Sequence, residues 1–288
     1  MRPEPVTRFA PSPTGFLHLG HAFSALTAWG RPGRCLLRIE DIDTARCRPE
    51  FEAAIHDDLR WLGLSWPEPV MRQSARRPAY GVALDRLVEL GVCYPCRCTR
   101  TEIRAALSAP QQGDAAQVYP GTCRGRSMVE AGPGDAIRLD ALRALRLAGR
   151  IGFTETGPVQ PGHHDVAAPL AGLGDVVLAR RDIGTSYHLA VVVDDAAQGV
   201  TEVVRGIDLF EVTALHRLLQ ALLELPTPSY YHHDLIRDES GKRLAKRDDA
   251  RAIRRFRAEG AGPEDVAAMV GLRLPVSGSR PPRHRAAR

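Results

Sequence analysis

The stretch from Thr7 to His21 combines residues whose types and spacing suit the binding of a phosphate. Apolar residues up to Ala10 predict a short strand, and Pro11 and Pro13 end it because proline lacks the N–H that a sheet needs. A helical pattern then begins at Leu19. A strand, a tight loop and a helix N-terminus in this order present backbone N–H groups and positive dipole ends to an anion. We therefore expect a nucleotide phosphate at this place.

His18 and His21 stand in the first turn of the expected helix. Either imidazole can donate a hydrogen bond to a phosphate oxygen. Gly20, between them, has no Cβ and leaves room for a flat ring or a phosphate close to the backbone. The alternative is that the two histidines lie on the surface or cap the helix, and their spacing alone does not decide between these readings.

Length and composition narrow the class of protein. The chain has 288 residues, enough for an α/β domain of about 150 residues and smaller units. No apolar run approaches the roughly 18–20 residues that span a bilayer, and no secretory signal pattern opens the chain, so we expect a cytoplasmic protein. A net charge of +5 and a pI near 9.0 favour a polyanionic partner.

Strand and helix patterns alternate in the first ninety residues and again after residue 175. Residues 35–39 predict a buried strand, and Glu40 follows it at the edge where open α/β sheets bind ligands. The remaining expectations are helices over 51–62, 78–90, 212–223, 250–259 and 263–270, strands over 136–139, 187–193 and 201–204, a hairpin over 176–184, and a loop over 156–173.

The distribution of these alternating strand and helix patterns divides the chain into parts. We expect the two halves of one catalytic domain over 1–92 and 175–225, because regular alternation is confined to them. Residues 93–174 lack it and predict an insertion. A helical segment over 226–275 and a disordered basic tail over 276–288 complete the expected order.

Six cysteines in a cytosolic chain argue for free thiols or a metal site rather than a disulfide framework. Cys96 and Cys98 supply two thiolates, and Cys123, just after a Pro-Gly turn, supplies a third, as a tetrahedral structural zinc site prefers. Cys93 is a rival ligand, and buried thiols without metal are the other alternative. His163, in the expected loop, is predicted to be solvated together with its neighbour.

Three segments occur in order: R-F-A-P-S-P-T-G with H-L-G-H over 8–21, R-I-E-D-I-D over 38–43, and G-K-R-L-A-K-R over 241–247. With V-V-R-G-I-D-L over 203–209, they closely resemble the class I aminoacyl-tRNA synthetases of the glutamyl type. In that family the first segment is the amino-acid loop with the HIGH motif. The segment over 241–247 stands where the family carries its KMSKS motif. The resemblance covers most of residues 6–250. It implies a Rossmann-type doubly wound parallel sheet with a zinc-bearing insertion and a C-terminal helical segment that contacts tRNA.

Only about forty residues follow Lys246, whereas full glutamyl-tRNA synthetases append helical anticodon-binding domains there. The chain therefore resembles the truncated paralogues, monomers that attach glutamate to the queuosine base at the wobble position of tRNA(Asp). The reaction implied is activation of L-glutamate by ATP, without tRNA, to glutamyl-adenylate, followed by transfer. The alternatives are a shortened synthetase that charges a tRNA 3′ end, an inactive tRNA-binding paralogue, and a HIGH-type nucleotidyltransferase for another acid.

Glutamate carries two carboxylates and an ammonium, so its site needs complementary charges. Arg8 and Arg205 are the fitting cations, because a guanidinium can grip a carboxylate through two parallel hydrogen bonds. The resemblance assigns the rest of this site to Glu40, which binds the α-ammonium, to Ala10 and Ser12, which line the amino-acid loop, and to the hydroxyl of Tyr187.

The resemblance assigns the binding of ATP and catalysis to His18, Gly20, His21 and Lys246, with magnesium accompanying ATP. We expect Lys246 to neutralise charge that moves onto the departing pyrophosphate in the transition state. Arg243 and Ala245 stand where the family motif has lysine and serine, which keeps the loop's charge but departs from its usual hydrogen bonding.

The resemblance also completes the zinc site. Glutamyl-type enzymes often supply the fourth ligand from a residue near the third cysteine, and in the truncated paralogues that residue resembles a tyrosine. It corresponds to Tyr119 here, beside Cys123. A phenolate oxygen is an unusual zinc ligand, so Cys93 stays the chemical rival.

Overall fold

The computed structural model describes residues 4–99, 101–103, 118–236 and 252–275. The chain forms two compact units, Met1–Arg72 with His233–Arg288, and Gln73–His232. None of the helices within the described ranges combines the length and the apolar character that a membrane crossing requires.

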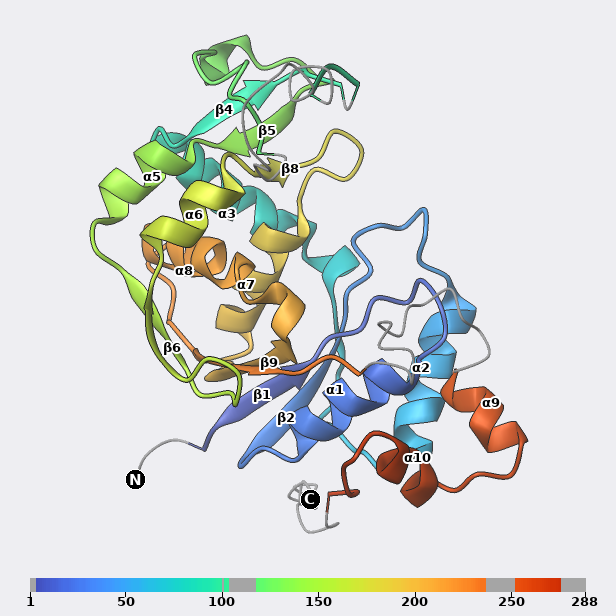
Figure 1. The fold of residues 1–288 in the computed structure, drawn as a ribbon. Helices are drawn as coiled ribbons and strands as arrows, with labels where there is room; N and C mark the ends of the chain where they lie inside the picture. Colours follow the sequence, from blue (N-terminus) through green and yellow to red (C-terminus); the bar gives the residue numbers. More distant parts are fainter. Residues whose placement is uncertain (1–3, 100, 104–117, 237–251, 276–288) are drawn as a thin grey trace, which may run out of the picture. The chain divides into compact units, whose positions relative to one another are not determined.

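A parallel sheet forms the centre of the first unit. Its strands are β1 (Val6–Phe9), β2 (Arg34–Ile39) and β3 (Met71–Arg72), in that spatial order. The helix α1 (Leu19–Trp29) connects β1 to β2 and packs against both strands (Figure 1). The strand, loop and helix expected from the first thirty residues are therefore confirmed.

The helix α2 (Pro49–Trp61) follows β2 and begins as its sequence predicts. Pro49 occupies its first turn, where the missing N–H costs nothing, and Glu50 and Glu52 place negative charge at the positive end of the helix dipole. Ile55 and Leu59 are fully buried. The apolar stripe expected over 51–62 is thus the face that packs into the first unit.

The chain after residue 251 returns to the loop that precedes α1. Ala252 forms an antiparallel β-bridge with His18. The short helices α9 (Ile253–Ala258) and α10 (Pro263–Met269) follow, and α10 packs against α1. Both C-terminal helices were expected from the sequence, with boundaries a few residues wider.

Three helices surround the core of the second unit. They are α3 (Arg77–Glu89), α7 (Tyr187–Ala197) and α8 (Val212–Leu222), and α7 packs against both of the others. The amphipathic pattern of α8 is confirmed, because its apolar side faces inward. The fully buried residues that these helices contribute include Leu87, Leu189, Leu215, Leu218 and Leu219.

Two small sheets lie around these helices. The first is antiparallel and contains β4 (Cys93–Cys96), β5 (Ala136–Leu139) and β8 (Val177–Ala179) in that order. The strand expected over 136–139 is therefore confirmed as β5, the central strand of this sheet.

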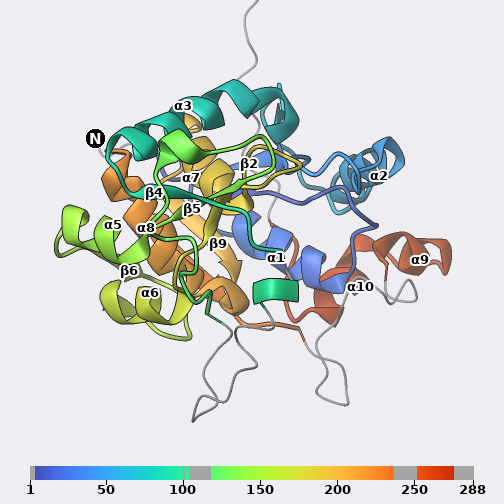
Figure 2. The same cartoon turned by 90° about the horizontal axis from the view of Figure 1, so that it is seen from above.

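The second sheet has the order β7, β6, β10, β9. Its strands are β6 (Gly152–Glu155), β7 (Gly162–Asp165), β9 (Glu202–Gly206) and β10 (Ser229–His233). Two further helices, α5 (Ala141–Ala148) and α6 (Ala167–Leu173), pack against each other and against α8 (Figure 2).

Three expectations for the second unit were wrong. The apolar run over 187–193 belongs to the helix α7 and is not a strand. Because α7 is buried on several sides, its sequence lacks the periodic polar positions that distinguish a helix from a strand. Residues 176–184 do not form a hairpin, since β8 pairs with β5. The expected loop over 156–173 contains β7 and α6, and β7 pairs with β6.

Asp194, fully buried on α7, ties that helix to the beginning of the second unit. Its carboxylate accepts hydrogen bonds from Gln73 Nε2 at 3.0 Å, Arg76 Nε at 2.7 Å and the Tyr80 hydroxyl at 2.7 Å. Three donors and one opposite charge replace the water that the carboxylate loses on folding. This cluster fixes the start of α3 against α7.

Asp58, on α2 in the first unit, is a buried acid with less support. Its side chain is 2% exposed, and Oδ2 has no hydrogen-bond partner among the described residues. Burial raises the pKa of Asp58 from 3.8 to about 6, although the positive charges of Arg257 and Arg254 lower it in part. The ionised carboxylate therefore destabilises the fold above pH 6.

We expect Asp58→Asn to stabilise the protein at neutral pH and to have little effect in acid. The folded state prefers the protonated acid, so the penalty of the charged form develops as the pH rises from about 4 to 6 and is complete above pH 7. Two pKa units correspond to roughly 3 kcal/mol in the free energy of unfolding. Urea unfolding between pH 4.5 and 8 measures the difference.

The matched control is Asp57→Asn, which removes a charge from the exposed neighbour on the same helix. It should change the free energy of unfolding by no more than about 0.5 kcal/mol. A difference in the free energy of unfolding between Asp58→Asn and wild type that stays the same at every pH would contradict this expectation.

Candidate substrate-binding and metal sites

His18 and His21 cap the N-terminus of α1. The Gly20 N–H donates to His18 Nδ1 and the His18 N–H donates to His21 Nδ1, each at 3.1 Å. The two rings lie 3.9 Å apart between centroids. In the structure these histidines therefore cap the helix, which is one of the two roles that the sequence left open.

Capping does not remove these histidines as donors to a phosphate. Because each Nδ1 accepts a backbone N–H, a neutral ring of this kind carries its own proton on Nε2. The N–H groups of Gly20 and His21 are already engaged, with His18 Nδ1 and the His18 carbonyl. An anion at this end of α1 would thus meet imidazole N–H groups rather than these two backbone donors.

Gly20 leaves room for a ring, as expected, but that ring belongs to the protein. A Cβ at Gly20 would lie 3.0 Å from Cε1 and 3.1 Å from Nδ1 of His18. These contacts are tight, so a side chain here would require the His18 ring to shift by a few tenths of an ångström. The glycine thus leaves the capping ring its present position.

The first unit holds Arg8 and Glu40 at the ends of neighbouring strands. Arg8 is 4% exposed on β1, and Glu40 follows β2 with 9% of its surface exposed. The Glu40 N–H donates to the Pro11 carbonyl at 3.1 Å, and Glu40 Oε1 accepts from the buried Arg38 Nη2 at 3.1 Å. Glu40 therefore lies beside the loop that also carries Ser12.

The positions of Ala10 and Ser12 agree with a loop that faces a ligand. Both residues are half-buried just after β1. The Ser12 carbonyl accepts the Thr14 N–H at 2.8 Å, and the Pro13 carbonyl accepts the Arg48 N–H at 3.0 Å. The second bond holds the loop against Arg48, the N-cap residue of α2.

The second unit contains the other two residues expected at a glutamate site. Tyr187 is the first residue of α7, and its ring contacts those of His188 and His216. Arg205, on β9, is 6% exposed, and all three of its guanidinium nitrogens donate to residues of the same unit. No sequence pattern indicated that histidines would surround Arg205.

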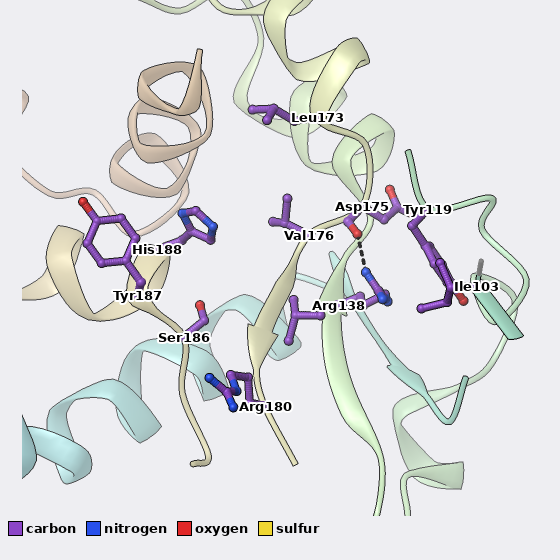
Figure 3. Close-up of a pocket in the computed structure, with 11 residues that line it drawn as sticks. Ile103, Tyr119, Arg138, Leu173, Asp175, Val176, Arg180, Ser186, Tyr187 and His188 are labelled. Atoms are coloured by element: carbon purple, nitrogen blue, oxygen red, sulfur yellow. Dashed lines mark hydrogen bonds between the residues drawn. The ribbon is translucent and has the colours of Figure 1, made fainter. Parts of the chain in front are cut away.

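A pocket of about 480 Å³ opens in the second unit beside Tyr187 (Figure 3). Tyr187 and His188 line one side, and Tyr119 and Arg138 line another. Arg138 is 9% exposed, and its Nη1 donates to the Asp175 carbonyl at 2.7 Å. The lining thus combines two arginines and Asp175 with apolar side chains such as Leu173 and Val176, the mixture that is common in sites for small ligands.

Cys96, Cys98 and Cys123 gather in one cluster, with their sulfur atoms within 4.8 Å of one another. The Tyr119 hydroxyl lies 3.4 Å from Cys96 Sγ and 3.5 Å from Cys98 Sγ, and Cys98 Sγ lies 3.4 Å from Cys123 Sγ. Sulfur atoms around tetrahedral zinc stand about 3.8 Å apart, given Zn–S distances of about 2.3 Å. The four side chains therefore fit a structural zinc ion.

Cys93 lies outside this cluster. It is three residues before Cys96 on β4, and residues at that spacing point to opposite faces of a strand. Burial raises the pKa of the Cys93 thiol to about 12, but it also raises the pKa of Cys98 and of Tyr119, so it is the position of Cys93 that sets it apart from the cluster. Burial also acts on Cys123, but the Arg97 backbone N–H and the hydroxyl of Tyr119 outweigh it and lower the pKa of Cys123 to about 7.

Asp175 and Arg138 hold the cysteine cluster in place, and sequence reasoning missed both. Asp175, which is 2% exposed, accepts hydrogen bonds from the Tyr94 hydroxyl at 2.6 Å and from Arg124 Nε at 2.8 Å. Arg138 Cζ lies 3.8 Å from the centroid of the Tyr119 ring. These contacts join β4, β5 and the loop of Cys123.

The remaining expected residues are those of the Lys246 segment and the two histidines at 163 and 164. Lys246, with Arg243 and Ala245, lies outside the described residues. His163, expected to be solvated in a loop, is exposed but belongs to the strand β7, as does its neighbour His164. Neither histidine belongs to a cluster of metal-binding type among the residues that the structure describes.

Comparison with known proteins agrees with this arrangement. Residues 5–279 match the family described as tRNA synthetases class I (E and Q), catalytic domain. The chain is 55% identical over 280 residues to the glutamyl-Q tRNA(Asp) synthetase of Rhodobacter capsulatus, covering 93% of this chain and 100% of that protein. It is 41% identical over 281 residues to the protein of the same name from Nitratidesulfovibrio vulgaris, covering 92% and 85%.

Solved structures show the same fold. The glutamate-tRNA synthetase from Elizabethkingia anophelis aligns with a TM-score of 0.74 and 28% identity, over 93% of this chain and 61% of that one. This chain thus spans about three-fifths of that synthetase's length. The methionyl-tRNA synthetase of Mycobacterium tuberculosis, at 13% identity, aligns with a TM-score of 0.60 over 94% of this chain and shares the fold.

The fold is therefore that of a class I tRNA synthetase catalytic domain, and the expected Rossmann-type α/β fold with a parallel sheet is confirmed. The chain belongs to the class I tRNA synthetases of the E and Q type, and within them to the group whose curated members are named glutamyl-Q tRNA(Asp) synthetase.

The capping role of His18 can be separated from any role as a phosphate donor. We expect His18→Ala to lower the free energy of unfolding by about 1 kcal/mol, because the Gly20 N–H loses its acceptor. His18→Asn should restore most of this stability, since its side-chain oxygen can accept the same N–H, yet it lacks the ring Nε2–H. Thermal unfolding of the two variants measures the difference, and equal losses in both would contradict it.

Proposed function

We propose that this protein activates L-glutamate with ATP and transfers it to queuosine at the wobble position of tRNA(Asp). The observation that carries the proposal is the 55% identity, along 93% of the chain, to a protein named glutamyl-Q tRNA(Asp) synthetase. In the first step a glutamate carboxylate oxygen attacks the α-phosphorus of ATP and pyrophosphate leaves. In the second, a queuosine hydroxyl attacks the carbonyl carbon of the adenylate and AMP leaves.

In the first unit we propose that Arg8 binds a carboxylate of glutamate and that Glu40 binds its α-ammonium. The burial of both charged groups supports these roles, because the attraction between a buried charge and an opposite charge on the substrate is stronger in the low local dielectric. Ala10 and Ser12 line the loop beside them. In the second unit, Arg205 binds a carboxylate and Tyr187 contributes its hydroxyl.

For the nucleotide, we propose that His18 and His21 donate from Nε2 to phosphate oxygens, a role that their Nδ1 contacts leave open. Gly20 leaves room for the His18 ring beside the backbone. Lys246 neutralises charge on the departing pyrophosphate. No side chain has to act as a covalent nucleophile, because positioning and electrostatics suffice for adenylate formation. Magnesium enters with ATP.

We propose that Cys96, Cys98, Cys123 and Tyr119 hold one structural zinc ion. The distances among their donor atoms support this set, and the lowered pKa of Cys123 favours a thiolate. Zinc there would fix the loop that contains Cys123 to β4. The proposal also places the protein in the cytoplasm, as a monomer, where ATP and tRNA are available.

A shortened glutamyl-tRNA synthetase, which charges a tRNA 3′ end, is the second candidate. The observation that favours it is the 29% identity, with a TM-score of 0.72, to a glutamate tRNA ligase from Elizabethkingia meningosepticum in complex with its amino acid. Both candidates form glutamyl-adenylate, but the shortened synthetase is expected to need tRNA for that step, and the two also differ in the acceptor.

The acceptor decides between them. We expect glutamate-dependent exchange of pyrophosphate into ATP without tRNA, and incorporation of labelled glutamate into queuosine-containing tRNA(Asp) only. The control is tRNA(Asp) that carries guanosine at the wobble position. Labelling of both tRNAs alike would favour the shortened synthetase. Binding of tRNA without any exchange would favour an inactive paralogue.

Zinc content tests the metal site. Elemental analysis of protein purified without chelators should give about one zinc per chain, since a full set of four ligands binds the metal tightly. Cys98→Ser should lose the metal and lower the melting temperature. Cys93→Ser, on the strand β4 that precedes Cys98, is the matched control and should keep the metal. Zinc-free wild-type protein, or loss of zinc in Cys93→Ser, would contradict the ligand set.

A further inference from the structure

The guanidinium of Arg205 is held on every nitrogen by neutral acceptors. Its Nε donates to His232 Nε2 at 3.0 Å, and its Nη1 donates to His216 Nδ1 at 3.0 Å. Its Nη2 donates to the Thr213 hydroxyl at 2.7 Å and to the Leu209 carbonyl at 3.2 Å. These acceptors come from β10, α8 and the turn before α8, so three separate segments fix the side chain.

The contacts of Arg205 determine the protonation of both histidines. A guanidinium can only donate, so the ring nitrogen that faces it must be an acceptor, and the ring must be neutral. The remaining proton of His216 then lies on Nε2, which stands 3.2 Å from His188 Nδ1. The proton of His232 lies on Nδ1, which stands 2.5 Å from Glu155 Oε2.

The groups at both ends of this chain agree with these proton positions. Burial, with the charge of Arg205, lowers the pKa of His188 to about 4, so His188 is neutral and its Nδ1 can accept. Burial would raise the pKa of Glu155, but hydrogen bonds from His232 and from the Gly157 N–H outweigh it and lower the pKa. Glu155 is therefore an anion that accepts from His232.

The arrangement keeps the positive charge of Arg205 available. No carboxylate among the described residues lies within ion-pair distance of its guanidinium, and the nearest anion in the hydrogen-bonded chain, Glu155, acts through the His232 ring. In contrast, the buried Arg38 contacts Glu40 directly at 3.1 Å. These neutral partners engage four of the five guanidinium N–H groups, so one Nη1 N–H has no partner among the described residues and is left for a single charge-assisted bond with a carboxylate.

We propose that His216 and His232 are positioning residues that orient Arg205 toward a carboxylate of the amino-acid substrate without neutralising it. Glu155 and His188 set the tautomers of the two rings. The inference rests on the proposed function only in taking that substrate to be glutamate. It predicts that the two histidines affect glutamate affinity specifically, although they need not touch glutamate.

Steady-state pyrophosphate exchange tests the proposal. We expect His216→Leu and His232→Leu to raise the KM for glutamate about 10- to 100-fold, as expected for losing an acceptor to a charged group, and to leave the KM for ATP within about twofold. His216→Asn and His232→Gln should recover most of the loss. Their side-chain oxygens replace Nδ1 and Nε2 respectively, so the acceptor facing Arg205 is kept.

Gln220→Leu is the matched control. Gln220 lies one helical turn after His216 on α8, is 3% exposed, and donates to the Tyr230 hydroxyl rather than contacting Arg205. It should lower stability without changing the KM for glutamate. If the control raises that KM equally, or if the leucine variants change both KM values alike, the histidines have only a structural role and the proposal is overturned.

A measurement without catalysis separates this proposal from the function itself. In protein labelled with ¹⁵N-arginine, the Arg205 Nε–H signal, identified by its loss in Arg205→Lys, should exchange slowly with solvent in wild type and His232→Gln. It should exchange faster in His232→Leu. Wild-type protein without pyrophosphate exchange but with this pattern would overturn the proposed function alone, whereas a signal unaffected by His232→Leu would overturn the positioning role.

Discussion

A charge that leaves water on folding must find partners, and this requirement organises the second unit. A buried carboxylate or guanidinium costs several kcal/mol unless hydrogen bonds replace its hydration. Asp194 meets the requirement with donors from the start of the unit, and Asp175 with donors from β4 and the loop of Cys123. Arg205 meets it with acceptors from β10 and α8. Each charge therefore joins segments far apart in the sequence.

Local patterns were enough to predict most of the first unit, although not the two-residue strand β3. The strand before Pro11, the helix from Leu19 and the apolar stripe of α2 each depend on signals within a few residues, such as proline geometry and helical periodicity. Glu40 could also be placed from the sequence, because parallel strands bring their carboxyl ends to one edge of the sheet and Glu40 directly follows β2.

The second unit could not be predicted in the same way. The run that begins at Tyr187 carries no period because α7 is buried on several sides, and β8 pairs with a strand about forty residues earlier. The partners of Arg205 come from separate elements, and an isolated histidine carries no local signal of what it will face. Sequence spacing did predict which cysteines cluster, since Cys96 and Cys98 are near neighbours, but not the carboxylate that braces their loop.

Tyr119 is part of both the cysteine cluster and the pocket beside Tyr187. Its hydroxyl stands among the sulfur atoms of the cysteine cluster, while the same residue forms part of the wall of the pocket that Tyr187 lines (Figure 3). A shift of this ring that accompanies binding at one of the two places would therefore also alter the other. Any coupling of that kind would be reciprocal, so that each ligand would change the affinity of the other by the same factor.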